Sequence, residues 1–67
     1  MAKETDVKFQ YIPNERYIIE IQDKESGRVY YTKRIGALSR AVSMAGEYNV
    51  SAGLSARIFD TKTGEII

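Results

Sequence analysis

The sequence predicts an α+β domain in which a small antiparallel sheet of four to five strands packs on one helix. Two observations predict it: a ten-residue pattern that occurs twice, and one stretch of helical periodicity between the two copies. The pattern occupies residues 21–30 and 58–67, and in each copy an Asp at the end of an apolar run is followed four residues later by a Gly. The expected order is strand, strand, strand, helix, strand, strand.

The repeated pattern predicts two β-hairpins with the same Asp-x-x-x-Gly turn. Asp23 and Asp60 end extended runs, and such a carboxylate accepts hydrogen bonds from the backbone of the turn it begins. Gly27 and Gly64 then supply a left-handed backbone conformation where the chain enters the return strand. We interpret the two copies as convergent turn chemistry, since the same turn occurs wherever hairpins do.

The N-terminal third divides into a tail, a short strand and the first hairpin. We expect residues 1–6 to form a frayed tail, and residues 7–67 a single domain. Residues 7–12 alternate apolar and polar side chains, which indicates a short strand that Pro13 ends. Residues 16–23 predict a strand, and residues 28–34, rich in β-favouring residues, predict its hairpin partner.

The period then changes to that of a helix. Leu38, Ala41, Val42, Ala45 and Tyr48 form an apolar stripe, which predicts a helix over residues 36–48. The two alanines indicate a close approach to the sheet. Asn49 is expected to end the helix as a left-handed C-cap. Residues 55–60 and 65–67 complete the prediction as a strand and its short return strand.

Composition limits the classes of function. The chain has 67 residues, no Cys, no His and a formal net charge of +1. A domain this small buries a thin core, so a homodimer is one expected way to gain stability. No apolar run approaches the roughly 20 residues of a membrane span, and we expect a cytoplasmic protein.

Side chains for catalysis are scarce. Without His or Cys the common metal ligands and nucleophile pairs are missing, and the five dispersed glycines fit no phosphate loop. Acidic pairs such as Glu20 and Asp23 lie in or beside a hairpin among basic side chains, where solvated charge explains them. We therefore expect no enzyme, no metal and no cofactor.

The first functional hypothesis is a protein-binding module. One helix covers only one face of a sheet, and Ile18, Tyr30 and Phe59 are candidates for an apolar surface on the other face. An exposed strand edge that receives a strand from a partner is the second form of the same hypothesis.

The alternative is a nucleic-acid-binding module. Between residues 28 and 46 the chain has basic residues and no acidic one. The basic side chains would contact phosphate, and a tyrosine would stack on an unpaired base. Its candidate residues are Arg28, Tyr30, Tyr31, Lys33, Arg34 and Arg40. The net charge near zero favours the protein-binding hypothesis.

A family resemblance points the same way. Residues 17–21, Tyr-Ile-Ile-Glu-Ile, and residues 58–66, which end in Asp-Thr-Lys-Thr-Gly-Glu-Ile, resemble segments of small phage and prophage proteins. The resemblance implies an accessory protein that binds and modulates a host component. The hairpin and helix are also similar to the arm-binding domains of phage integrases, which place a three-stranded sheet on DNA. The extra C-terminal hairpin and modest charge depart from that pattern.

Overall fold

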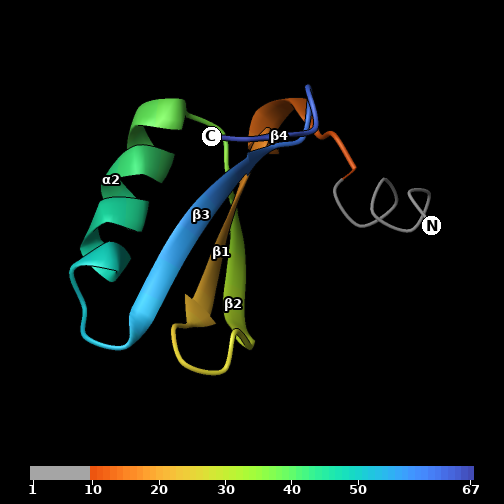
Figure 1. Cartoon of the computed structure of the whole chain (residues 1–67). Coiled ribbons are helices and arrows are strands. Elements are labelled where there is room, and N and C mark those ends of the chain that lie inside the picture. Colours follow the sequence, from red (N-terminus) through yellow and green to blue (C-terminus); the bar gives the residue numbers. More distant parts are fainter. Residues whose placement is uncertain (1–9) are drawn as a thin grey trace.

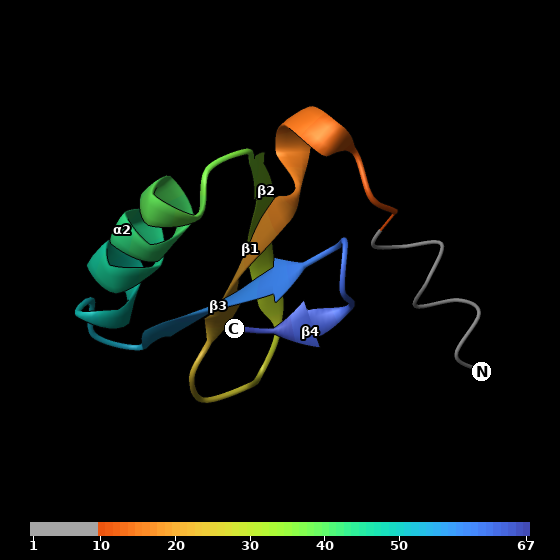
Figure 2. The same ribbon diagram turned by 90° about the horizontal axis from the view of Figure 1, so that it is seen from above.

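One helix packs on one face of a four-stranded antiparallel sheet (Figure 1, Figure 2). The computed structural model describes residues 10–67. The strand order in the sheet is β2-β1-β3-β4, so β1 and β3 are central. The elements are η1 (Pro13–Glu15), β1 (Tyr17–Asp23), β2 (Val29–Ile35), α2 (Leu38–Asn49), β3 (Leu54–Asp60) and β4 (Glu65–Ile66).

The predicted strand over residues 7–12 is the main difference from the expected order. Residues 7–9, like the expected tail, lie outside the described residues, and residues 10–12 are not in a strand. The chain instead bends at the short 3-10 helix η1, where the Glu15 N–H donates to the Ile12 carbonyl at 2.8 Å. The order of the described elements is therefore strand, strand, helix, strand, strand, and the four strands of the sheet are within the predicted number of four to five.

Both hairpins have the predicted turn. Gly27 and Gly64 have φ angles of 74° and 79°, and each donates its N–H to the carbonyl of the Asp four residues earlier, at 2.8 and 2.7 Å. In the first turn Asp23 Oδ2 accepts from both the backbone N–H and the hydroxyl of Ser26. These hydrogen bonds lower the pKa of Asp23.

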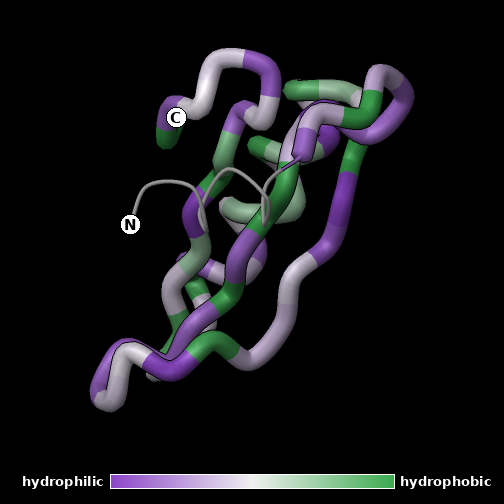
Figure 3. The backbone as a smooth tube through the Cα atoms, turned by 90° about the vertical axis from the view of Figure 1, so that its right-hand side faces the viewer, coloured by the Kyte–Doolittle hydropathy of each residue, from purple (hydrophilic) through white to green (hydrophobic). Residues whose placement is uncertain are grey.

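The core lies between α2 and the sheet. Figure 3 shows hydrophilic and hydrophobic residues interspersed along the backbone. Successive side chains of a strand point to opposite faces, so one set of them faces the helix. Ala41 and Ala45 are buried, which confirms the expected close approach. The buried cluster consists of Tyr17, Ile19, Ile21, Ile35, Ala41, Ala45 and Ile58. The helix packs mainly on β3 and β1, and less on β2.

The C-terminal end of α2 differs from the expected left-handed cap. Asn49 is the last helical residue, and no residue other than Gly within 10–67 has a positive φ. The Asn49 side chain instead reaches β3, where its Oδ1 accepts from the Ala56 N–H at 2.9 Å and its Nδ2 donates to the Ala56 carbonyl at 3.4 Å. This amide occupies a stretch of the outer edge of β3 that the two-residue β4 does not reach.

The face of the sheet opposite α2 is covered by its own side chains. Ile18 is 5% exposed and Glu20 only 2%, so the prediction that Ile18 belongs to an uncovered apolar surface is wrong. Ile18 lies between Phe59 and Arg34 in the sheet register, and the Arg57 guanidinium lies over the Phe59 ring and pairs with Glu20 at 2.8 Å. Gln22 donates to the same carboxylate at 3.1 Å. Strand β1 is consequently buried on both faces.

Candidate functional site

Strand β2 is the longer of the two edge strands of the sheet, since the other, β4, has only two residues. It is seven residues long, and among the described residues it pairs only with β1. The outer edge of β3, by contrast, is closed by the Asn49 amide, by β4, and by the Ile67 N–H, which donates to the Ile58 carbonyl at 2.9 Å. An edge strand presents unpaired N–H and C=O groups, which makes β2 a place where another strand can add.

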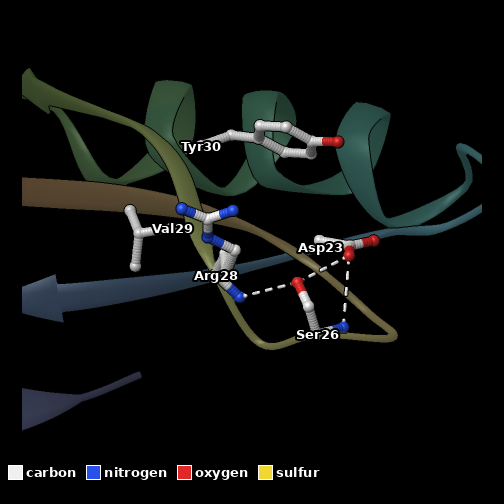
Figure 4. A pocket seen from close by; sticks show the side chains of 5 residues that line it. All are labelled: Asp23, Ser26, Arg28, Val29 and Tyr30. Carbon is white, nitrogen blue, oxygen red and sulfur yellow. Dashed lines mark hydrogen bonds between the residues drawn. The ribbon is translucent and has the colours of Figure 1, made fainter.

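A β-bulge at Tyr30 decides where the two adjacent tyrosines lie. Tyr31 pairs with Ile21 and Val29 with Gln22, so Tyr30 is an extra residue in β2. A bulge breaks the alternation of side chains between the two faces. Figure 4 shows the Tyr30 ring on the α2 side of the strand and Val29 on the other side. Tyr30 and Tyr31 therefore both lie on the side that faces the helix.

The two tyrosines join a third at a hollow of about 480 Å3 between β2 and the end of α2. The rings of Tyr31 and Tyr48 have centroids 6.4 Å apart and are tilted by 44°. Tyr30 is 69% exposed and Tyr31 is 44% exposed, so large parts of both rings face solvent. We call this the tyrosine hollow, and it is lined by Ile21, Tyr30, Tyr31, Tyr48, Ala52 and Leu54.

A second hollow of similar volume lies beside the first hairpin (Figure 4). Tyr30 lines both hollows and so stands between them. The Ser26 hydroxyl donates to Asp23 and accepts from the Arg28 N–H at 3.2 Å, which holds the loop closed on itself. The side chains of Asp23 and Ser26 are thus engaged within the loop, whereas the Arg28 side chain is exposed.

The predicted protein-binding trio does not form one surface. Ile18 and Phe59 are register partners on the face away from the helix, but Ile18 is buried and Phe59 lies under Arg57. Tyr30 lies on the helix side because of the bulge. Tyr48 and Leu54 were missed as companions of Tyr30, and the apolar stripe of the helix, which includes Tyr48, was the one signal for them.

The predicted basic residues are divided between the two faces. Lys33 is opposite Ile19 and so lies on the helix side, whereas Arg34 is opposite Ile18 on the other face. Arg34 donates to the Glu15 carbonyl at 3.3 Å, next to η1. Arg28 is in the hairpin and Arg40 in the first turn of α2. The four cations therefore do not make one continuous patch.

Arg16 and Asp60 form an ion pair that links the start of β1 to the end of β3. Hydrogen bonds from Arg16 lower the pKa of Asp60 to about 2. Among the described residues, no cluster of three or more acidic side chains could hold a metal ion. None of the helices in that part of the chain is both long and apolar enough to cross a membrane. Two exposed features that could recognise another molecule are the β2 edge and the tyrosine hollow.

Comparison of the chain with protein-family models, with curated proteins and with solved structures gave no significant match.

Proposed function

We propose that the chain is a non-enzymatic protein-binding module that receives an extended segment of a partner protein on the edge of β2. An apolar side chain of that segment enters the tyrosine hollow. The observation that carries the proposal is the position of a seven-residue open edge directly beside three tyrosine rings. We also propose a cytoplasmic location, which suits a chain without Cys.

Two physical arguments support this proposal. An added strand gains affinity from main-chain hydrogen bonds and specificity from pockets that take alternate side chains. Tyrosine is enriched among the residues that dominate binding energy, because its ring buries a large area with few rotatable bonds. In this chain Tyr31 belongs both to the edge strand and to the tyrosine hollow, so the two contributions meet at one residue.

The proposal favours a protein over a nucleic acid as partner. A nucleic-acid surface needs several cations along one track, because most of its affinity comes from phosphate contacts. Lys33 and Arg34 lie on opposite faces of the sheet, and the formal net charge of the chain is only +1. A small phage-type accessory protein that modulates a host protein would fit this proposal.

The test is selection of random twelve-residue peptides on the immobilised protein, followed by NMR mapping of the selected peptides. We expect the amide shifts to change along β2 and around the tyrosine hollow. Tyr31→Ala and Tyr48→Ala should each weaken binding about tenfold or more, the loss of one interface anchor. Tyr11→Ala is the matched control, because Tyr11 is 41% exposed and lines neither hollow.

Four results would overturn the proposal. Peptides that shift only residues away from β2 would place the binding site elsewhere, and no enrichment at all would remove the strand-addition mechanism. Binding of random oligonucleotides at about 50 mM salt that falls steeply at higher salt would establish the nucleic-acid alternative. Light scattering could also show a dimer, and β2 amide shifts could place its contact on this edge. A second copy of the chain would then be the occupant.

A further inference from the structure

The β2 edge also specifies the chemistry of its ligand, an inference that rests on the proposed function. We propose that the bound segment runs antiparallel to β2 and carries acidic residues at two alternate positions, followed by an aromatic residue at the next alternate position. In order from its N-terminus the segment reads acidic, any, acidic, any, aromatic.

The register of β2 sets the spacing of this motif. Tyr31 and Lys33 are opposite Ile21 and Ile19, so both lie on the helix side of the sheet, about 6.6 Å apart along the strand. Side chains of an added strand alternate in the same way. The ligand residue next to Lys33 and the one next to Tyr31 are therefore two positions apart and face the same side.

Charge then selects an acidic residue at the first of these positions. Lys33 is exposed, and the ion pairs among the described residues, Arg16–Asp60 and Arg57–Glu20, leave it out. No acidic residue occurs between Arg28 and Gly46, so nothing in β2 or in the first turns of α2 neutralises this cation. An acidic ligand residue beside Lys33 gains an ion pair, whereas a basic one is repelled.

Arg40 supplies the second cation at the far end of the edge. The helix runs back along the sheet (Figure 1), and Tyr48 lies level with Tyr31, where their rings meet. Arg40 is eight residues earlier, about 12 Å along the helix axis, whereas Ile35 is about 13 Å from Tyr31 along β2. Arg40 therefore lies level with the Ile35 end, where the first acidic position of the ligand begins.

The aromatic position follows from the bulge. Regular pairing on β2 runs from Ile35 to Tyr31 and is interrupted at Tyr30. A ligand residue beside Tyr31 is one strand spacing away, about 4.8 Å, which an aromatic side chain spans. Its ring would lie against Tyr31 and Tyr30 at the mouth of the tyrosine hollow, where offset or edge-to-face contacts between rings are favourable.

Antiparallel direction is preferred because parallel pairing is slightly less stable per residue. Direction also makes the motif asymmetric, since a parallel ligand would read aromatic before acidic. A peptide and its reversed sequence therefore distinguish the two orientations without any change in composition.

The experiment measures fluorescence anisotropy with the peptide Thr-Glu-Thr-Glu-Thr-Phe-Thr-Thr, its reversed sequence, and a version with Lys in place of Glu. We expect the first peptide to bind, the reversed one to bind about tenfold more weakly, and the Lys version not to bind. Lys33→Glu should weaken binding of the Glu peptide about tenfold, and the double variant Lys33→Glu with Arg40→Glu should create binding of the Lys peptide. Lys62→Glu makes the same change of net charge in the second hairpin and should leave both results unchanged.

The outcomes separate this inference from the proposed function. Equal loss in Lys33→Glu and Lys62→Glu, or equal affinity for the reversed peptide, would overturn the acidic antiparallel motif. If selected peptides of other composition still shift the β2 amides, the strand-addition function stands and only the motif fails. If no peptide shifts those amides, both fall. Circular dichroism of Lys33→Glu checks that the sheet is intact.

Discussion

Arg16 and Asp60, 44 residues apart in the sequence, form a two-point ion pair that joins the start of β1 to the end of β3. Arg16 Nε donates to Asp60 Oδ1 at 2.8 Å and Nη2 donates to Oδ2 at 2.6 Å. Asp60 Oδ1 also accepts from the Lys62 N–H at 3.0 Å, within the second turn. One carboxylate therefore fixes both the turn that it begins and the central strand beside it.

Asp60 should make the stability of the fold depend on pH in the acidic range. The hydrogen bonds from Arg16 lower the pKa of Asp60 from 3.8 to about 2. The ionised carboxylate therefore stabilises the folded state at pH values above the pKa of the unfolded state. This contribution is lost as the pH falls from about 4 toward 2. We expect the melting temperature of Asp60→Asn to be lower than that of the natural chain near neutral pH, and to fall less between pH 5 and pH 2.

Glu65→Gln is the control for this experiment, since Glu65 is an exposed acid in the same hairpin. It should keep the acid dependence of the natural chain. Equal acid dependence in Asp60→Asn and the natural chain would mean that the ion pair does not couple protonation to folding.

Glu20 and Arg57 should be strongly coupled in a double-mutant cycle. Glu20 is almost fully buried, and Oε1 accepts from Arg57 Nε at 2.8 Å as well as from Gln22. Arg57→Gln removes the cation and should cost about 1–3 kcal/mol in the free energy of unfolding. In the double variant with Glu20→Gln the loss should be smaller than the sum of the single losses, by about 1 kcal/mol in urea unfolding. Additive losses would show that the two side chains act independently.

The local turn and helix patterns were sufficient to predict much of this fold. Both Asp-x-x-x-Gly turns depend on residues within five positions of one another, and the helical stripe places Ala41 and Ala45 against the sheet. The covered far face depends on Glu20 and Arg57, which are 37 residues apart, so no local pattern reveals it. The run Tyr17-Ile18-Ile19 was the available signal, because a strand buried on both faces loses its alternation.

The site was harder to predict because of one extra residue. Strict alternation along 28–34 separates Tyr30 from Tyr31, but the bulge brings both to the helix side. Neither Gly nor Pro marks the bulge in the sequence. Proximity in the chain groups Lys33 and Arg34 with Arg28 and Arg40, although adjacent strand residues point to opposite faces.

Alanine at two glycines should have opposite effects on stability. Gly64 has a φ of 79°, where a side chain is strained, so Gly64→Ala should cost about 1–2 kcal/mol. Gly46 lies within α2 with open space around its Cα, so Gly46→Ala should stabilise the fold by about 1 kcal/mol. Thermal unfolding should therefore show melting temperatures that move in opposite directions, by about 4–8 °C per kcal/mol. Shifts of the same sign would contradict one of these two backbone assignments.

Asn49 should protect the outer edge of β3 from solvent exchange. Its side chain pairs with both the N–H and the C=O of Ala56, in the way that a neighbouring strand would. In Asn49→Ala the Ala56 amide should exchange with solvent much faster, while the Ile19 amide in the central strand keeps its rate. Asn49→Asp retains an oxygen that can accept from the Ala56 N–H, so it should restore most of the protection. Unchanged exchange of the Ala56 amide in Asn49→Ala would mean that another group covers this edge. The Asn49 amide would then not be what distinguishes the covered edge of β3 from the open edge of β2.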